Sequence, residues 1–216
     1  MKASEWVAIG LLSSCALAGA LRGATLEVKL EQQSGAPLSE AVVAAYPIDA
    51  KLPSTAPTVA IMDQRDRRFV PHILAVQTKT HVSFPNSDSV SHHVYSFSKA
   101  GRFQIYLTRG QPAKEVVFDQ PGVVTLGCNL HDWMLGYILV LDTPYFVSTD
   151  SAGAARLERL PPGRYRFEVW HPRITDGAAL LQRELELADA SPASWTLRLS
   201  HALLVARDQR PGLSGY

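Results

Sequence analysis

Apolar and polar positions alternate over short runs along most of this chain. Runs rich in β-branched and aromatic residues are separated by clusters of Gly, Pro, Asn, Asp and Ser, which is typical of strands joined by turns. No long stretch shows the apolar period of a helix. The clearest expected strands are residues 25–31, 72–77, 80–84, 92–97, 115–118, 122–128, 136–141 and 164–170. The pattern therefore predicts an all-β fold made of β-sandwiches.

Two segments far apart in the chain have strand and turn patterns that could belong to a single small domain. The first, "SGAPLSEAVV", leads into a strand centred on Val42. The second, "TDSAGAARLERLPPGRYRF", places a hairpin turn and a Pro-Pro-Gly turn before an alternating strand. These stretches resemble the two halves of a carboxypeptidase-regulatory-like or transthyretin-like β-sandwich, although about ninety residues separate them here. The resemblance implies one small sandwich made of residues 24–50 plus 143–200, followed by a tail over 201–216.

The intervening segment, residues 57–142, contains all the side chains that are candidates for binding a metal. We expect it to form a second sandwich that is inserted into the first. The alternative is two adjacent domains, in which residues 25–50 supply edge strands to the first domain.

The N-terminus has the features of a secretory signal. Lys2 precedes an almost unbroken run of apolar and small residues, and small residues end the run at Ala20. The run is too short and too rich in small residues for a membrane span. We therefore expect residues 1–20 to be a signal peptide cleaved after Ala20, and the protein to be periplasmic or otherwise exported. The alternative is a lipoprotein anchored through Cys15, because "LSSC" resembles a lipobox.

The net charge and the number of cysteines limit the classes of molecule that this protein is expected to bind. The net charge is +1, and no lysine or arginine cluster stands out, so nucleic acid and anionic membrane surfaces are poor candidates as partners. If Cys15 leaves with the signal, Cys128 is the one remaining cysteine and has no internal disulfide partner. A lone thiol in an oxidising compartment is a liability unless something, such as a metal, occupies it. The sequence carries no signal of an oligomeric state.

Cys128, His131 and Met134 follow one another at intervals of three residues in "GCNLHDWMLG". Alone, such a grouping is usually incidental, because buried free cysteines are common. His92, at the start of an expected strand, supplies a second imidazole. Two histidines, a cysteine and a weak methionine describe a blue-copper electron-transfer site. Zinc prefers four good N or S ligands, and haem attachment would need a second cysteine before the histidine.

Residues 57–142 resemble a cupredoxin of the plastocyanin and amicyanin branch. "HILAVQTKTHVSFPNSDSVSHHV" is similar to the family's early strands and its first histidine, and "VVFDQPGVVTLGCNLHDWMLGYILV" to its ligand loop and closing strand. The loop has the compact amicyanin spacing. The resemblance implies a Greek-key β-sandwich with one type 1 copper ion bound by His92, Cys128, His131 and Met134. Likeness to amicyanin also suggests methylamine utilization, by family association only.

The sequence departs from this family at His93, where many members have an asparagine that braces the cysteine loop. The imidazole of His93 could replace that brace, bind the metal itself or be a proton-sensitive neighbour. His72 is expected to be a structural histidine, with a second metal ligand as the alternative. Asn86 and Asp88 are expected to pin a turn rather than to bind metal.

The surface beside His131 is the place where redox partners dock in this family. Leu130, Trp133 and Leu135 are therefore expected to form an apolar rim around this histidine, unless Trp133 packs inward beneath the loop. Asp132 is expected to be a solvated carboxylate of the same loop.

These expectations favour an exported electron carrier that exchanges one electron between redox protein partners. We expect no enzymatic activity, because a saturated copper site leaves no position for a substrate. One alternative is a copper-binding and delivery protein that uses His72 or His93 as further ligands. Another is a structural binding module in which the cupredoxin-like part is only scaffold.

Overall fold

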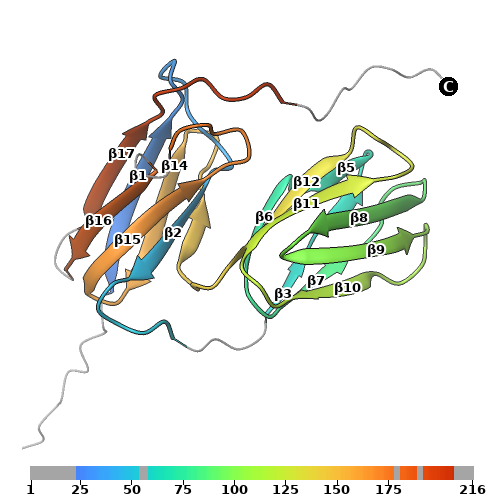
Figure 1. Cartoon of the computed structure of the whole chain (residues 1–216), viewed down its shortest axis with the longest axis horizontal. Coiled ribbons are helices and arrows are strands. Elements are labelled where there is room, and N and C mark those ends of the chain that lie inside the picture. The colour runs from blue at the N-terminus through green and yellow to red at the C-terminus, as the bar shows by residue number, and fades with distance from the viewer. Residues whose placement is uncertain (1–22, 54–57, 178–180, 189–191, 207–216) are drawn as a thin grey trace, which may run out of the picture.

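The computed structural model describes residues 23–53, 58–177, 181–188 and 192–206 (Figure 1). The strands of this part form five sheets, so the predicted all-β fold class is confirmed. Within these ranges no helix is long and apolar enough to cross a membrane. The expected signal peptide, the lipobox cysteine and the end of the tail lie outside the described residues.

A three-stranded and a four-stranded sheet, ordered β14-β1-β17 and β13-β2-β15-β16, lie on the left of Figure 1. In β1 every second side chain is buried, as expected for a strand with one face on a core. Leu26, Val43, Phe167 and Trp195 belong to that core. The strands are β1 (Ala24–Glu31), β2 (Val42–Pro47), β13 (Phe146–Ser148), β14 (Ala154–Leu160), β15 (Gly163–Trp170), β16 (Gln182–Leu187) and β17 (Ala193–Arg198).

The strands between β2 and β13 in the sequence form the second group of sheets. These are ordered β10-β7-β3, β6-β12-β11-β8-β9 and β4-β5. Val82, Phe84, Phe118, Leu126 and Ile138 belong to the core of this group. The strands are β3 (Val59–Ile61), β4 (Asp63–Arg65), β5 (Arg68–Val70), β6 (Ile73–Gln77), β7 (Thr80–Phe84), β8 (His92–Ser98), β9 (Gly101–Leu107), β10 (Lys114–Phe118), β11 (Gly122–Cys128) and β12 (Leu135–Leu141).

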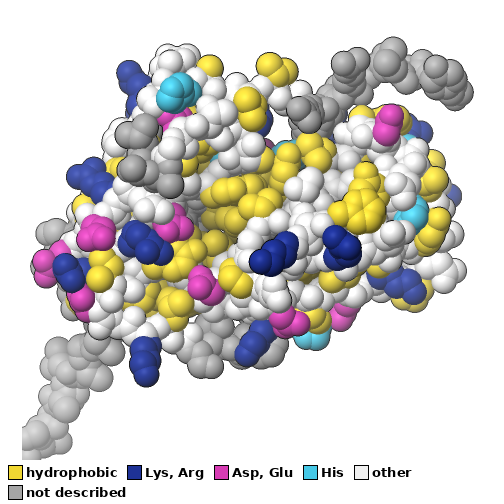
Figure 2. Space-filling model, viewed as in Figure 1, with side chains coloured by type: hydrophobic (Ala, Val, Ile, Leu, Met, Phe, Trp, Pro, Cys, Tyr) yellow, Lys and Arg dark blue, Asp and Glu magenta, His cyan; other side chains and the backbone are white. Residues whose placement is uncertain are grey.

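The two groups of sheets meet through a third apolar cluster. Val42 and Ala44 of β2 pack in it with Ile73 of β6 and with Leu139 and Leu141 of β12. The sequences of β2 and β12, VVAAYP and LGYILVL, contain runs of consecutive buried residues instead of alternation. A strand that is covered on both faces has this character. Figure 2 shows hydrophobic side chains gathered between the two groups on the face drawn.

The pairing of β8, β11 and β12 brings one end of each of these three strands to the same edge of the five-stranded sheet. In β11, Cys128 pairs with Val94 and Gly127 pairs with Tyr95 of the antiparallel β8. β11 also pairs antiparallel with β12, from Gly127 opposite Leu135 onward. The start of β8, the end of β11 and the start of β12 therefore lie together.

Candidate metal centre

The cysteine and both histidines predicted from the sequence lie at this edge of the sheet. His92 is the first residue of β8, and Cys128 is the last residue of β11. His131 lies in the loop that joins β11 to β12. His92 and Cys128 are buried, whereas His131 is partly exposed. One donor atom from each of the three residues lies within 4.8 Å of the other two.

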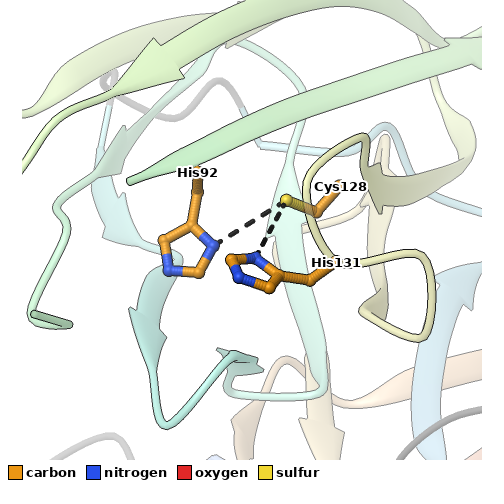
Figure 3. Close-up of side chains that lie close together, drawn as sticks. All are labelled: His92, Cys128 and His131. Carbon is orange, nitrogen blue, oxygen red and sulfur yellow. Dashed lines mark hydrogen bonds between the residues drawn. The ribbon is translucent and has the colours of Figure 1, made fainter. Parts of the chain in front are cut away.

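Both imidazoles direct the same ring nitrogen at the sulfur (Figure 3). The Sγ atom of Cys128 is 3.8 Å from Nδ1 of His92 and 3.7 Å from Nδ1 of His131. The centroids of the two imidazole rings are 4.9 Å apart. Two donors that bind one ion at about 2.0–2.3 Å lie roughly 3.6–3.8 Å apart at angles between tetrahedral and trigonal. Both sulfur-to-nitrogen distances fit one shared ion, and the soft thiolate with two imidazoles is a donor set suited to copper.

The far nitrogen of His92 faces a carboxylate. Nε2 of His92 donates to Oδ2 of Asp88 over 2.8 Å. The sequence placed Asp88 only in a turn, so this contact is one that sequence reasoning missed. The available signal was an acidic residue four positions before the histidine, in "DSVSH". Histidine ligands of metals commonly donate their second ring N–H to a carboxylate in this way.

Burial and mutual contacts shift the pKa values of the three cluster residues in the metal-free protein. Burial alone raises the pKa of the Cys128 thiol, but hydrogen bonds from His92 and from backbone amides bring it below its ordinary value. Burial alone lowers the pKa of His92, but hydrogen bonds to Cys128 and Asp88 bring it above its ordinary value. The pKa of His131 is lowered, first by burial and then by the charge of His92. These shifts favour a thiolate at Cys128 and a neutral imidazole at His131, the forms that bind a metal, whereas His92 must lose a proton when it binds one.

His93 fills the bracing position that the sequence left open. Nδ2 of Asn129 donates to Nδ1 of His93 over 2.9 Å, and the backbone N of Asn129 donates to the carbonyl O of His93 over 3.0 Å. The ring of His93 stacks on that of Tyr106 at a centroid distance of 3.9 Å. Nε2 of His93 is buried and has no hydrogen-bond partner among the described residues. His93 therefore ties β8 to the residue after Cys128 and is not part of the His92–Cys128–His131 cluster.

The remaining residues singled out from the sequence are not members of the cluster of His92, Cys128 and His131. Met134 is 3% exposed and packs in the same core as Cys128, and its backbone N donates to the carbonyl O of His131. His72 lies outside the cluster and contacts the ring of Tyr137 edge-on. The Asn86 side chain donates to the carbonyls of Val90 and Leu107 and so pins its turn.

The loop around His131 exposes apolar side chains. Leu130 is 53% exposed and Trp133 is 41% exposed, and the indole contacts the imidazole of His131 edge-on at 5.4 Å. Leu135 is partly buried and Asp132 is exposed. Trp133 therefore lies at the surface beside His131 rather than beneath the loop.

No protein-family model matches the chain, and no match is found among curated proteins. Solved structures that resemble part of it include a purple cupredoxin from Nitrosopumilus maritimus, at 26% identity, 38% coverage of this chain, 99% coverage of that chain and a TM-score of 0.34. A reduced amicyanin mutant has 19% identity, 45% and 99% coverage and a TM-score of 0.35. A copper-containing nitrite reductase from Thermus scotoductus has 20% identity, 44% and 25% coverage and a TM-score of 0.35. These TM-scores are too low to support conclusions about the site. The metal centre is therefore inferred from the geometry of this chain's own residues.

Proposed function

We propose that this protein is an exported one-electron carrier with a type 1 copper site formed by His92, Cys128, His131 and Met134. The observation that carries the proposal is the convergence of both Nδ1 atoms on the Cys128 sulfur, at 3.7 and 3.8 Å. When bound there, copper supplies the exchange of one electron between Cu(II) and Cu(I). Met134 would be the fourth and weaker donor, because it is buried in the same core as Cys128 and follows the loop histidine by three residues.

The protein's part in this function is to hold the donors still. Cys128 is fixed at the end of a paired strand, and His92 is fixed by its bond to Asp88. His93 and Asn129 tie the cysteine loop to β8 by two hydrogen bonds. A site that is held in this way changes little between oxidation states, so little reorganisation accompanies electron transfer. Burial of His92 and Cys128 keeps bulk water from these donors.

We assign electron exchange to the surface beside His131. His131 is the one partly exposed member of the cluster, and Leu130 and Trp133 expose apolar area next to it. A redox protein with an apolar contact surface would bring its own centre close to this imidazole. We propose no enzymatic activity, because four protein donors leave no position for a substrate.

The expected signal peptide and domain division complete the proposal. Export is tested by the mass of the mature protein recovered from the periplasm, which should begin after Ala20; a lipid-modified Cys15 at the N-terminus would contradict cleavage there.

We propose that residues 57–142 form an inserted cupredoxin-like domain within a transthyretin-like sandwich. This is supported by the sheets of β3–β12, which share no strand with those of β1, β2 and β13–β17.

Electron transfer is distinguished from copper delivery by retention of the metal. The purified protein is loaded with Cu(II), reduced, and mixed with a Cu(I) chelator while its voltammetric response is followed. A carrier gives a reversible one-electron wave and keeps its copper over many cycles, and Cys128→Ala abolishes the wave. Rapid loss of Cu(I) to the chelator would favour delivery instead, and absence of stoichiometric copper would favour a structural binding module.

A further inference from the structure

The Asp88 carboxylate accepts hydrogen bonds from three groups, two consecutive backbone amides about twenty residues earlier and the His92 side chain four residues later. Its Oδ1 accepts from the backbone N of Asp66 over 2.6 Å, and its Oδ2 accepts from the backbone N of Arg67 over 2.9 Å. The same Oδ2 accepts from Nε2 of His92 over 2.8 Å. The Asp88 side chain is 11% exposed and that of His92 is fully buried, so this contact is largely shielded from water.

The two backbone amides belong to the turn between β4 and β5. Asp66 and Arg67 are its two central residues, and both have left-handed φ angles, 53° and 55°. Such a two-residue turn favours Asn-Gly or Asp-Gly, and each non-glycine residue in this region carries backbone strain. Because Asp88 accepts from both amides, its carboxylate holds the turn closed, and the closed turn fixes the carboxylate.

We propose that Asp88 is the positioning residue of the metal centre, which holds His92 with Nε2 protonated and Nδ1 free for the metal and lowers the reduction potential of the bound copper. This inference rests on the proposed function. The orientation follows from the geometry, since an ionised carboxylate only accepts hydrogen bonds and the nitrogen facing it must carry the proton. The potential follows from charge, because a buried anion beside a ligand stabilises Cu(II) more than Cu(I).

The test separates this role from the structural role in the turn. The decisive variant combines Asp88→Asn with Asp66→Asn and Arg67→Gly, because Asn-Gly favours this turn without help from a carboxylate. The first control has Asp66→Asn and Arg67→Gly only. The second control, Asp132→Asn, removes one negative charge from an exposed position in the ligand loop.

We expect the decisive variant to fold and to bind copper with a higher reduction potential than either control. If Cu(II) binding weakens tenfold more than Cu(I) binding, the rise is about 59 mV. The loss of total copper affinity is expected to be about 10–100-fold. In the Cu(I) protein, the Nε2 proton of His92 should give a slowly exchanging NMR resonance that is retained in both controls and exchanges fast in the decisive variant. Equal potentials and equal exchange rates in all four proteins would overturn the proposal.

Failure of the proposed function is separable from failure of this inference. If the wild-type protein binds no copper but binds Zn(II), the electron-carrier function fails, and the same variants are compared by Zn(II) affinity. Positioning by Asp88 then predicts a loss of about 10–100-fold in the decisive variant only. Equal Zn(II) affinities, or a wild-type protein that binds neither metal, would overturn the role of Asp88 as well.

Discussion

His93 and Asn129 join β8 to the ligand loop by two hydrogen bonds, one between their side chains and one between their backbones. They lie directly after His92 and Cys128 in the sequence, so the two bonds tie the first histidine of the cluster to the cysteine. The side-chain bond is partly buried. Removing the side-chain hydrogen bond between His93 and Asn129 is therefore expected to lower the stability of the protein and to weaken metal binding.

We expect Asn129→Ala to lower the free energy of unfolding of the metal-free protein by about 1 kcal/mol, the usual net value of such a bond. His93→Ala should cost more, because it also removes the stack on Tyr106. Urea unfolding of both variants and of the double variant gives the coupling between the side chains, expected at about 0.5–1.5 kcal/mol. Strict additivity of the two single effects would show that the side-chain bond contributes nothing.

The Cys128 thiol of the metal-free protein should ionise below its ordinary pH range. Burial alone would raise its pKa, but the hydrogen bond from His92 and the backbone amides lower it. Thiolate absorbance near 240 nm, followed against pH with Cys128→Ser as the blank, measures this directly. In His92→Ala the largest lowering cause is lost, so the ionisation should move to higher pH. The same titration curve in both proteins would exclude a role for His92.

Tyr137 and Trp170 meet edge-on across the two groups of sheets, with ring centroids 6.0 Å apart. We expect Trp170→Ala to lower the free energy of unfolding by about 2–4 kcal/mol through lost apolar burial, while the copper spectrum stays unchanged. Trp133→Ala is the matched control. Its indole is 41% exposed beside His131, so it should change stability by no more than about 0.5 kcal/mol but alter electron exchange. Urea unfolding and electron self-exchange rates compare the two variants.

His171 follows Trp170 and is buried. Burial, then the charges of Arg173 and His72, lower its pKa from 6.5 to about 4. The unfolded chain therefore binds a proton at higher pH than the folded chain does. The stability contributed by neutral His171 is fully present above about pH 6.5 and is lost as pH falls toward 4, by up to about 3 kcal/mol.

His171→Asn removes this titration while keeping a polar acceptor near the backbone N of Arg173, which donates to Nδ1 of His171. Unfolding free energies are measured from pH 4 to 7 for both proteins. The difference between wild type and variant should shrink as pH falls through this window. A difference that is constant with pH would contradict the buried neutral histidine.

Much of the fold was predictable because the core strands carry their own signal. The expected strands at 80–84 and 122–128 coincide with β7 and β11, in which buried positions alternate with more exposed ones. β16 was not among the strands expected from the sequence. Its residues, QRELEL, are mostly polar and exposed, and it lies at the edge of its sheet. Pairing with β15, and not its own hydrophobicity, makes it a strand.

The candidate site was predictable in its residue types but not in its surroundings. The spacing of Cys128 and His131, with His92 at a strand start, predicted the three residues that the structure brings together, whereas the role of Met134 as a ligand stays a prediction. The bond from His92 to Asp88 had a local signal, an acidic residue four positions before the histidine. The hydrogen bonds from the Asp66–Arg67 turn to Asp88, by contrast, depend on how β4 and β5 pack against the loop before β8. No local pattern in the sequence encodes that approach, because it is set by tertiary packing.

The measurement that tests the central claim most directly is visible absorption together with electron paramagnetic resonance of the Cu(II)-loaded protein and of Cys128→Ser. Our account predicts an intense thiolate-to-copper band and unusually narrow copper hyperfine splitting in the wild type, both lost in the variant. Weak colour with ordinary square-planar copper signals, or no stoichiometric copper, would contradict a type 1 site formed by His92, Cys128, His131 and Met134.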